Sequence, residues 1–318
     1  MRVAVRERLA ELGAGTIVVD DPAPWSRALN LDHHVGGRTP PAWRGDVSTA
    51  VVLAALDAGL DPAEYRCAAI RHFDTDGCLA VWALTHPREA LAQRDLLLAA
   101  ARYGDFYEAG EDAEARNAVA LSCYLQEHLF EAHERERRAS LRELFAHALE
   151  QLPCVLRDPG CVEAAWREHV ERFEADRAAL ASQPRNGAPR VRVVERAREP
   201  SLGALVSSFD APVLVWAVPA AGGRRYGALL RPRYGWGYAS EAVGHVPLRD
   251  LRPACARLQA RERARGGRAR WYPETFDRTV WRLRTHGAPS ALPPEVVRDE
   301  LEALLPHHSS PEAASPCA

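Results

Sequence analysis

The chain has 318 residues, of which 47% are hydrophobic, so it is long enough for two domains with sizeable cores. Its basic residues, all of them arginine, nearly balance its acidic residues, and the net charge of −2 excludes the global basic field of a protein whose main partner is long nucleic acid. No apolar run is long enough to span a membrane, and the N-terminus lacks the hydrophobic region of a signal peptide, so a cytoplasmic protein is expected.

The cysteine and lysine contents give two further indications, about the redox state of the thiols and about the source of the protein. Seven cysteines are scattered without a Cys-x-x-Cys pair, which is typical of reduced thiols rather than of a disulfide framework or a zinc site. The absence of lysine together with abundant alanine and arginine indicates a GC-rich, bacterial source.

The first hundred residues alternate between strand-like and helix-like segments. Short β-branched or apolar runs at 15–21, 28–34 and 65–74 predict strands, and 46–62 predicts a helix that stops at Gly59. This alternation predicts an α/β fold with a mainly parallel sheet and flanking helices.

The rest of the chain predicts a helical middle region and a smaller C-terminal α+β domain. Two helices separated at Pro87 are expected first, and residues 113–183 carry apolar residues at helical spacing. Turn formers follow at 182–189, and then strand-like runs with a last helix. The predicted organisation is an α/β metal-site domain at 1–110, a helical region at 111–185, an α+β substrate-binding domain at 190–305 and a disordered tail at 306–318.

The segment RHFDTDG, residues 71–77, places a histidine and two acids at alternate positions after a predicted buried strand. Successive side chains of an extended chain point to opposite faces, so His72, Asp74 and Asp76 are expected on one face, with Gly77 permitting a sharp turn into the next helix. Carboxylates this close repel one another unless protons or a cation neutralise them. Imidazole beside carboxylate suits a first-row divalent metal, above all Mn²⁺, with Mg²⁺ or Zn²⁺ as alternatives.

Two more acidic groups stand at predicted strand ends. Asp-His-His at 32–34 ends one strand, and Asp20 and Asp21 end the strand before it. Because the carboxyl ends of parallel strands meet along one edge of a sheet, these groups are expected to face one crevice with residues 72–76. Each motif alone is usually a turn or a surface arrangement, and it is their joint occurrence that favours a metal site.

These motifs resemble those of the DHH phosphoesterase superfamily. HFDTDG resembles its HxDxDG motif, LNLDHHV its Asp-His-His motif, and GDVSTAVVLAAL the Ser-Thr-containing helix that follows that triplet. The resemblance covers residues 15–106. In the usual family order HxDxDG comes first, whereas here Asp-His-His precedes it, so we interpret the chain as a bacterial subfamily with a rearranged motif order. The strands need only be neighbours for the same site to form.

The resemblance implies two divalent metal ions, Mn²⁺ above all. By motif, the first ion would be held by His72 and Asp74, and the second by Asp76, His33 and Asp105. The aspartate that bridges the ions would be Asp20 or Asp21, and we favour Asp20 because it directly follows the β-branched run.

Three further residues are candidates for the chemistry itself. The resemblance implies that Asp32 orients a histidine and that His34 faces the scissile phosphate as hydrogen-bond donor or general acid. Arg38 follows on a glycine-rich loop and is a candidate for neutralising phosphate charge.

Arginines among aromatic residues at 222–238 are weaker candidates for substrate binding. Arginine forks bind phosphate, aromatic faces stack bases, and DHH enzymes often grip the substrate with a smaller C-terminal domain. The candidates are Arg224, Arg225, Arg231 and Arg233. In a lysine-free protein, arginine on the solvent face of a sheet is the simpler interpretation.

The sequence therefore predicts a metal-dependent phosphoesterase that hydrolyses a phosphodiester, phosphomonoester or phosphoanhydride in a nucleotide or small metabolite. The alternative is a catalytically inactive DHH-like module that binds nucleotide or metal. A metal-dependent hydrolase of another bond, such as an amide, also stays open because its metal chemistry is the same. The substrate is not specified, and a homodimer through the helical region is left open.

Overall fold

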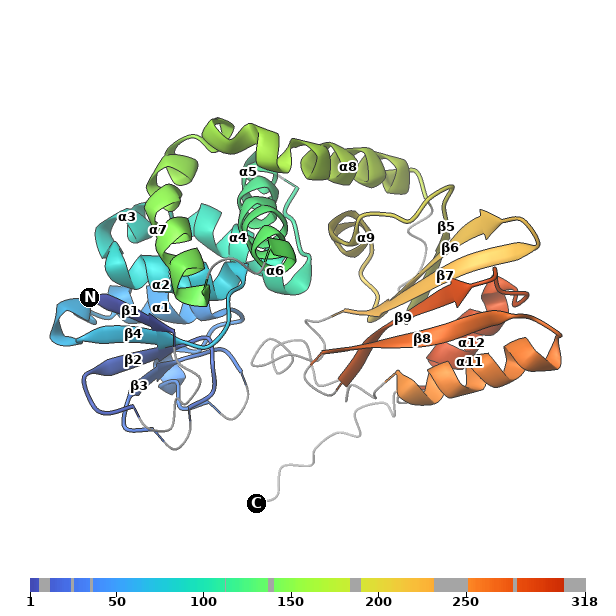
Figure 1. Cartoon of the computed structure of the whole chain (residues 1–318), viewed down its shortest axis with the longest axis horizontal. Helices are drawn as coiled ribbons and strands as arrows, with labels where there is room; N and C mark the ends of the chain where they lie inside the picture. The colour runs from blue at the N-terminus through green and yellow to red at the C-terminus, as the bar shows by residue number, and fades with distance from the viewer. Residues whose placement is uncertain are drawn as a thin grey trace, which may run out of the picture. The chain divides into compact units, whose positions relative to one another are not determined.

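A computed structural model of the chain forms two compact units, which are described separately (Figure 1). The structure describes residues 1–5, 12–23, 26–34, 37–111, 113–136, 140–183, 190–231, 251–276 and 279–305. The first unit contains the described residues up to 183 and residues 201–208, and the second contains 190–200 and the described residues from 209 onward. The predicted tail, 306–318, and Arg233 lie outside the described residues.

The first unit is built on a four-stranded parallel sheet in the order β1-β4-β2-β3. Its strands are β1 (Arg2–Val5), β2 (Thr16–Val19), β3 (Leu29–Leu31) and β4 (Cys67–Ile70). The α/β class with a parallel sheet is as the sequence predicts, although β2, β3 and β4 are each shorter than the run that indicated them, and β1 was not predicted. The carboxyl ends of β2, β3 and β4 are neighbours, which places the residues that follow them along one edge.

Two largely buried helices each follow one strand of this sheet. Helix α1 (Ser48–Asp57) follows β3, and α2 (Thr75–Thr85) follows β4. All residues of α2 from Thr75 to Leu84 are buried, which explains its unbroken apolar run, because a helix covered on all sides needs no polar face. In Figure 1, α1, α2 and α7 lie against the sheet, and α4 packs on α2.

The remaining α-helices and a π-helix of the first unit follow one another closely along the chain as far as α8, and α9 comes after strand β5 (Val191–Glu195) of the second unit. They are α3 (Pro87–Ala92), α4 (Arg94–Phe106), α5 (Ala113–Cys123), a π-helix (Tyr124–Phe130), α6 (Glu131–Glu136), α7 (Leu141–Arg157), α8 (Glu163–Ala181) and α9 (Leu202–Ser208). Pro87 begins α3, where its missing N–H costs nothing. Ser140 and Glu143 form a capping box that starts α7. Among the helices of the described ranges, none is both long and apolar enough to cross a membrane.

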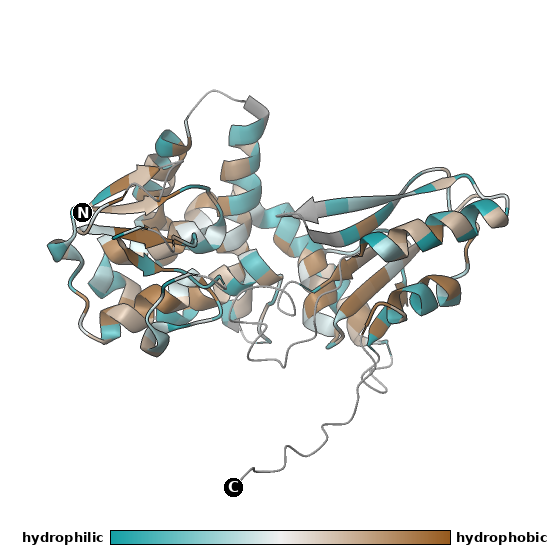
Figure 2. Ribbon diagram, turned by 90° about the horizontal axis from the view of Figure 1, so that it is seen from below, coloured by the Kyte–Doolittle hydropathy of each residue, from teal (hydrophilic) through white to brown (hydrophobic). Residues whose placement is uncertain are grey.

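The second unit is a mixed five-stranded sheet in the order β5-β6-β7-β9-β8, with two helices on one face. Its elements are β5 (Val191–Glu195), β6 (Val213–Ala220), β7 (Gly223–Leu230), α11 (Arg252–Ala264), β8 (Ala269–Phe276), β9 (Thr279–Gly287) and α12 (Pro294–Glu302). Alternate residues such as Val213, Val215 and Ala217 enter one core with Leu258 and Val297 of the helices. Figure 2 shows helices that alternate between hydrophilic and hydrophobic colour, as elements with one buried face do.

Candidate metal centre

The acidic and histidine side chains at the sheet edge of the first unit come together. Asp20 follows β2, the Asp-His-His triplet follows β3, and His72 follows β4. Asp74 caps α2, Asp76 lies in the first turn of α2, and Asp105 lies near the end of α4. Within each of three groups, the ligand atoms lie within 4.8 Å of one another, as a metal site requires: Asp20, His72 and Asp74; His33, Asp76 and Asp105; and Asp20, His33 and His34.

The first group surrounds one nitrogen of His72. The Nε2 atom of His72 lies 2.8 Å from Oδ2 of Asp74 and 3.3 Å from Oδ2 of Asp20. Asp74 is fixed in turn because its Oδ1 accepts a hydrogen bond of 2.7 Å from the backbone N–H of Gly77, at the N-terminus of α2. One oxygen of Asp74 therefore caps a helix while the other faces the group.

The second group contains a histidine with a fixed tautomer. Nδ1 of His33 lies 2.8 Å from the backbone carbonyl oxygen of Asp46. A carbonyl oxygen only accepts, so Nδ1 carries the hydrogen and Nε2 presents a lone pair. This lone pair faces carboxylate oxygens of Asp20 at 3.5 Å and Asp105 at 3.6 Å. Burial, aided by the charge of His34, lowers the pKa of His33 to about 3, so the ring is neutral at physiological pH.

Asp76 joins the second group to the start of α1. Its carboxylate accepts the backbone N–H groups of Ser48 at 2.6 Å and Thr49 at 2.8 Å, which are otherwise unpaired donors of the first helical turn. The hydroxyl of Ser48 donates to Oδ1 of Asp20 at 2.8 Å. The Ser-Thr segment thus holds two acids of the site, one by backbone and one by side chain.

The expected single face of an extended chain is wrong for His72, Asp74 and Asp76. Strand β4 ends at Ile70, and Asp76 is already in helix α2, so Asp76 belongs to a different group from the other two. Gly77 does not make a turn either. It provides space, since a Cβ atom there would lie 2.6 Å from Cδ1 of Ile70 and 2.8 Å from Oδ2 of Asp20.

The two candidate bridging acids have different environments. Asp20 is shared by two of the three groups, and its backbone is left-handed, with φ of 55°, a conformation uncommon for residues other than glycine. The carboxylate of Asp21 instead binds Arg71, accepting its Nε–H at 2.7 Å and its backbone N–H at 3.0 Å. Oδ2 of Asp21 also lies 3.6 Å from Nδ1 of His72. The geometry therefore favours Asp20 as the shared ligand and Asp21 as a neighbour that orients His72.

Asp32 and His34 form a close pair, whereas Arg38 lies elsewhere. Oδ1 of Asp32 is 2.6 Å from Nδ1 of His34, and Asp32 is fully buried. Burial alone would lower the pKa of His34, but the hydrogen bond to Asp32 and the charge of Asp20 outweigh it and raise the pKa to about 9. The guanidinium of Arg38 is exposed and donates to the carbonyl oxygen of Ser26 at 3.2 Å. Within the described part of the chain, the hydrogen bonds of Arg38 are with Asn30 and Ser26 and not with the acids of the site.

The electrostatics of the cluster suit a bound cation. Burial and the charge of Asp74 raise the pKa of Asp20 to about 6. Burial and the charge of Asp20 raise the pKa of Asp76 well above its usual value, and burial with the charge of Asp76 does the same for Asp105. Buried acids that repel one another gain most from a divalent ion, and oxygen with imidazole nitrogen is a donor set that divalent first-row metals accept. The residues present therefore fit a metal site.

Sequence reasoning missed the supporting residues. Arg71, Asp21 as partner of His72, and Asp46 as partner of His33 lie next to predicted ligands but carry no motif of their own. Phe73 is another, since its ring stacks with Phe130 and makes an edge contact with Phe145 of α7. Only the proximity of Arg71 and Phe73 to the HxDxDG motif could have drawn attention to them.

The candidate arginines of the second unit are not brought together. Arg224 and Arg225 are consecutive on β7, so they point to opposite faces of the sheet, and Nε of Arg224 lies 3.6 Å from Oε2 of Glu195. Arg231 is buried, and its Nη1 lies 3.0 Å from Oδ1 of Asp210. Arg233 lies outside the described residues.

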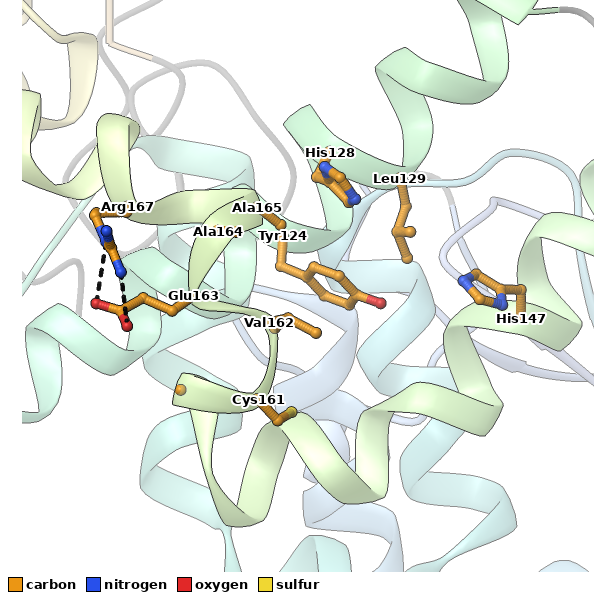
Figure 3. A pocket seen from close by; sticks show the side chains of 11 residues that line it. Tyr124, His128, Leu129, His147, Cys161, Val162, Glu163, Ala164, Ala165 and Arg167 are labelled. Carbon is orange, nitrogen blue, oxygen red and sulfur yellow. Dashed lines mark hydrogen bonds and ion pairs between the residues drawn. The ribbon is translucent and has the colours of Figure 1, made fainter.

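A separate open cavity of about 530 Å³ lies between the π-helix, α7 and the start of α8 (Figure 3). Tyr124 and His128 of the π-helix line it, and His147 stands across from them on α7. Glu163 and Arg167 at its rim form an ion pair with each other. None of the residues that line the cavity belongs to the acidic groups above.

Comparison with known proteins identifies the family of the chain. A model described as a family of unknown function (DUF6687) matches residues 5–314, so the chain belongs to that family. Neither the curated proteins nor the solved structures contain a match to the chain.

Proposed function

We propose that this member of the family is a metal-dependent phosphoesterase with two divalent ions, preferably Mn²⁺. The observation that carries the proposal is the pair of groups, Asp20–His72–Asp74 and His33–Asp76–Asp105, in which Asp20 of the first group lies 3.5 Å from Nε2 of His33 in the second. Two neighbouring sets of three ligands, with a carboxylate of one set within reach of the other, are the arrangement that a binuclear site needs. The motif resemblance to DHH phosphoesterases supports the same activity, in a rearranged order.

The residues of the chain have separate tasks in this proposal. Bound divalent ions supply Lewis-acid stabilisation of phosphoryl oxygens and a water nucleophile at neutral pH. Asp20 ties the two groups together, and the Asp46 carbonyl keeps the Nε2 lone pair of His33 available as a ligand. The amide-bound carboxylate of Asp76 keeps one lone pair on each oxygen for coordination.

His34 is the proposed proton donor. Asp32 accepts a hydrogen bond from Nδ1–H and stabilises the imidazolium, so the other ring nitrogen can donate a hydrogen bond to a phosphoryl oxygen or a proton to the leaving alkoxide. In the metal-free chain the hydrogen bond to Asp32 and the charge of Asp20 outweigh burial and raise the pKa of His34 to about 9, and the hydrogen bond to Asp32 favours the protonated ring that a general acid requires. The side chain is 26% exposed, so a small phosphorylated substrate can reach it.

The proposal is tested by metal content and turnover together. Protein purified without chelator is analysed for metal, titrated with Mn²⁺ by calorimetry, and assayed with bis-p-nitrophenyl phosphate. Wild-type protein should bind two ions per chain and hydrolyse the ester, and Asp74→Asn and Asp76→Asn should each lose metal and lower turnover by at least about 100-fold. Asp57→Asn, the same change at an exposed acid of α1, is the matched control and should change neither. Full activity and full metal content in both site variants would refute the proposal.

One observation favours a second function, a binding module without turnover. Both oxygens of Asp76 already accept helix amides, so this residue has a structural task that would persist in an inactive protein. A module of this kind would bind Mn²⁺ or a nucleotide tightly and hydrolyse neither ester nor anhydride in the same assays.

A further inference from the structure

The loop before α1 contacts several members of the metal centre. The carbonyl of Asp46 accepts the hydrogen on Nδ1 of His33, and two residues later Ser48 donates its amide to Asp76 and its hydroxyl to Asp20. A shift of this loop would therefore move three side chains of the site at once. Whatever fixes the loop also fixes the site.

Arg102 of α4 binds the carboxylate of Asp46, which lies in this loop. Its Nε lies 2.7 Å from Oδ2 of Asp46 and its Nη2 lies 3.2 Å from Oδ1, so the contact is a bidentate fork. Such forks fix geometry as well as charge, which a lysine cannot do. The carboxylate of Asp46 is 18% exposed, so the pair is partly shielded from water.

Helix α4 thereby contributes to the second group in two ways. Asp105, one of its members, lies one turn after Arg102 on the same helix, and Arg102 reaches across to the loop that orients His33. Neither Arg102 nor Asp46 belongs to any of the candidate ligand groups. Their contribution is to the position of ligands.

The geometry points to Arg102 and Asp46 as a positioning pair that keeps His33 in its Nδ1–H tautomer, with Nε2 aimed at the acids, and thereby sets the affinity of the second metal. The statement about affinity rests on the proposed function, whereas the statement about the tautomer does not.

A second ion pair supplies a matched control. Arg94, at the start of α4, pairs with Asp57, at the end of α1, so it joins the same two parts of the fold as Arg102 does. The acid of this pair is more exposed than Asp46, and neither residue belongs to the candidate ligand groups. If the ion pairs act only by holding α1 and α4 together, Arg94→Ala should have the same effect as Arg102→Ala. If Arg102 positions His33, the effect should appear only when Arg102 is changed.

The first measurement uses the metal-free protein. The ¹⁵N shifts of the His33 ring, assigned by their disappearance in His33→Gln, report which nitrogen carries the hydrogen. Wild type and Arg94→Ala should show the Nδ1–H tautomer alone, and Arg102→Ala and Arg102→Lys should show a mixture. The Nδ1–H tautomer unchanged in Arg102→Ala would overturn the inference, whether or not the protein binds metal.

The second measurement is a Mn²⁺ titration of the same four proteins by calorimetry. Arg102→Ala should bind one of two ions about 10- to 100-fold more weakly, with Arg102→Lys between it and wild type and Arg94→Ala unchanged. Equal weakening of Mn²⁺ binding in Arg94→Ala and Arg102→Ala would show that both pairs only hold α1 and α4 together, and would overturn the inference. Wild-type protein without two bound ions would refute the proposed function and the statement about affinity, and would leave the tautomer to decide the rest. Arg102→Lys keeps the charge and gives a folded variant where Arg102→Ala does not fold.

Discussion

The parallel sheet of the first unit and the mixed sheet of the second treat charged side chains in opposite ways. In the first, parallel strands end at one edge, so Asp20, His33 and His72 converge from three separate segments. In the second, consecutive arginines alternate between the two faces of β7, so Arg224 and Arg225 diverge although they are adjacent in sequence. Nearness in sequence is therefore a poor guide to a shared site, and strand direction is a good one.

The two regions differ equally in how charge is balanced. Arg282 and Arg284 of β9 lie within ion-pair distance of both Glu199 and Glu274, so the arginine-rich sheet neutralises itself. In the first unit, burial and the charges of neighbouring acids instead raise the pKa values of Asp20, Asp76 and Asp105, whereas His72 outweighs burial and lowers the pKa of Asp74. Buried acids that repel one another are stabilised by a bound cation. This is the physical reason to test metal binding in the first unit and not in the second.

The largest effect is expected from Asp20→Asn, which changes the residue that two groups share. Asparagine tolerates the left-handed backbone at this position and keeps an oxygen for the Ser48 hydroxyl, so the fold should persist. Metal content should fall by at least one ion per chain, and turnover by at least about 100-fold.

The same substitution should stabilise the metal-free protein. Ionised Asp20 opposes folding at neutral pH because burial raises its pKa to about 6, so its removal should increase the free energy of unfolding by on the order of 1–3 kcal/mol. Urea unfolding in the presence of chelator measures this. Normal metal content in Asp20→Asn, or a less stable metal-free variant, would contradict the assignment of Asp20 as a shared ligand.

The pH dependence of metal binding is expected to come next in size. Ligands must lose their protons to bind metal, and raised pKa values at Asp20, Asp76, Asp105 and His72 mean that protons are held there in the metal-free protein. Affinity for Mn²⁺ should therefore rise with pH, by about tenfold for each pH unit when one proton is displaced between pH 5 and 6. His33, with its pKa lowered to about 3, should contribute nothing in this range.

Calorimetry in buffers of different ionisation enthalpy counts the protons released at each pH. The number of protons released at pH 5.5 should be unchanged in a variant of a histidine outside the acidic groups, such as His147→Ala on the cavity of Figure 3. An affinity independent of pH between 5 and 7 would show that the acids are ionised before metal binds.

The difference between the two regions also explains what the sequence could predict. The ligand types at strand ends were predictable because apolar runs, their ends and the motif at 72–77 are local patterns, and β2, β3 and β4 all occur where such runs lie. The placement of Asp76 in a helix was not, because the apolar run before it does not show that β4 stops at Ile70. Strand β1 pairs with β4 across more than sixty intervening positions, and no local pattern encodes such a pairing.

Partners of the ligands were harder still to predict. The carbonyl of Asp46 and the amides of Ser48 and Thr49 are backbone groups, so residue type carries no signal of their hydrogen bonds. The candidate arginines that the structure describes in the second unit do not gather at one site, and the reason is different. Their clustering in sequence reflects a lysine-free composition, and alternation along β7 then separates Arg224 from Arg225.

The smallest effects are expected at these arginines, and they test the second half of the comparison. Arg231 is 8% exposed and bonds the carbonyl of Phe209 and the carboxylate of Asp210, so Arg231→Ala should cost about 1–2 kcal/mol of unfolding free energy through lost packing and hydrogen bonds. Arg225 is exposed, and Arg225→Ala should change stability by less than about 0.5 kcal/mol.

Neither arginine variant should alter the Michaelis constant for the ester by more than about twofold, because a side chain that does not touch substrate loses no binding energy when truncated. Steady-state kinetics of the two variants beside wild type measures this. A tenfold rise in the Michaelis constant of Arg225→Ala with unchanged kcat would return the exposed face of β7 to the list of substrate-binding surfaces.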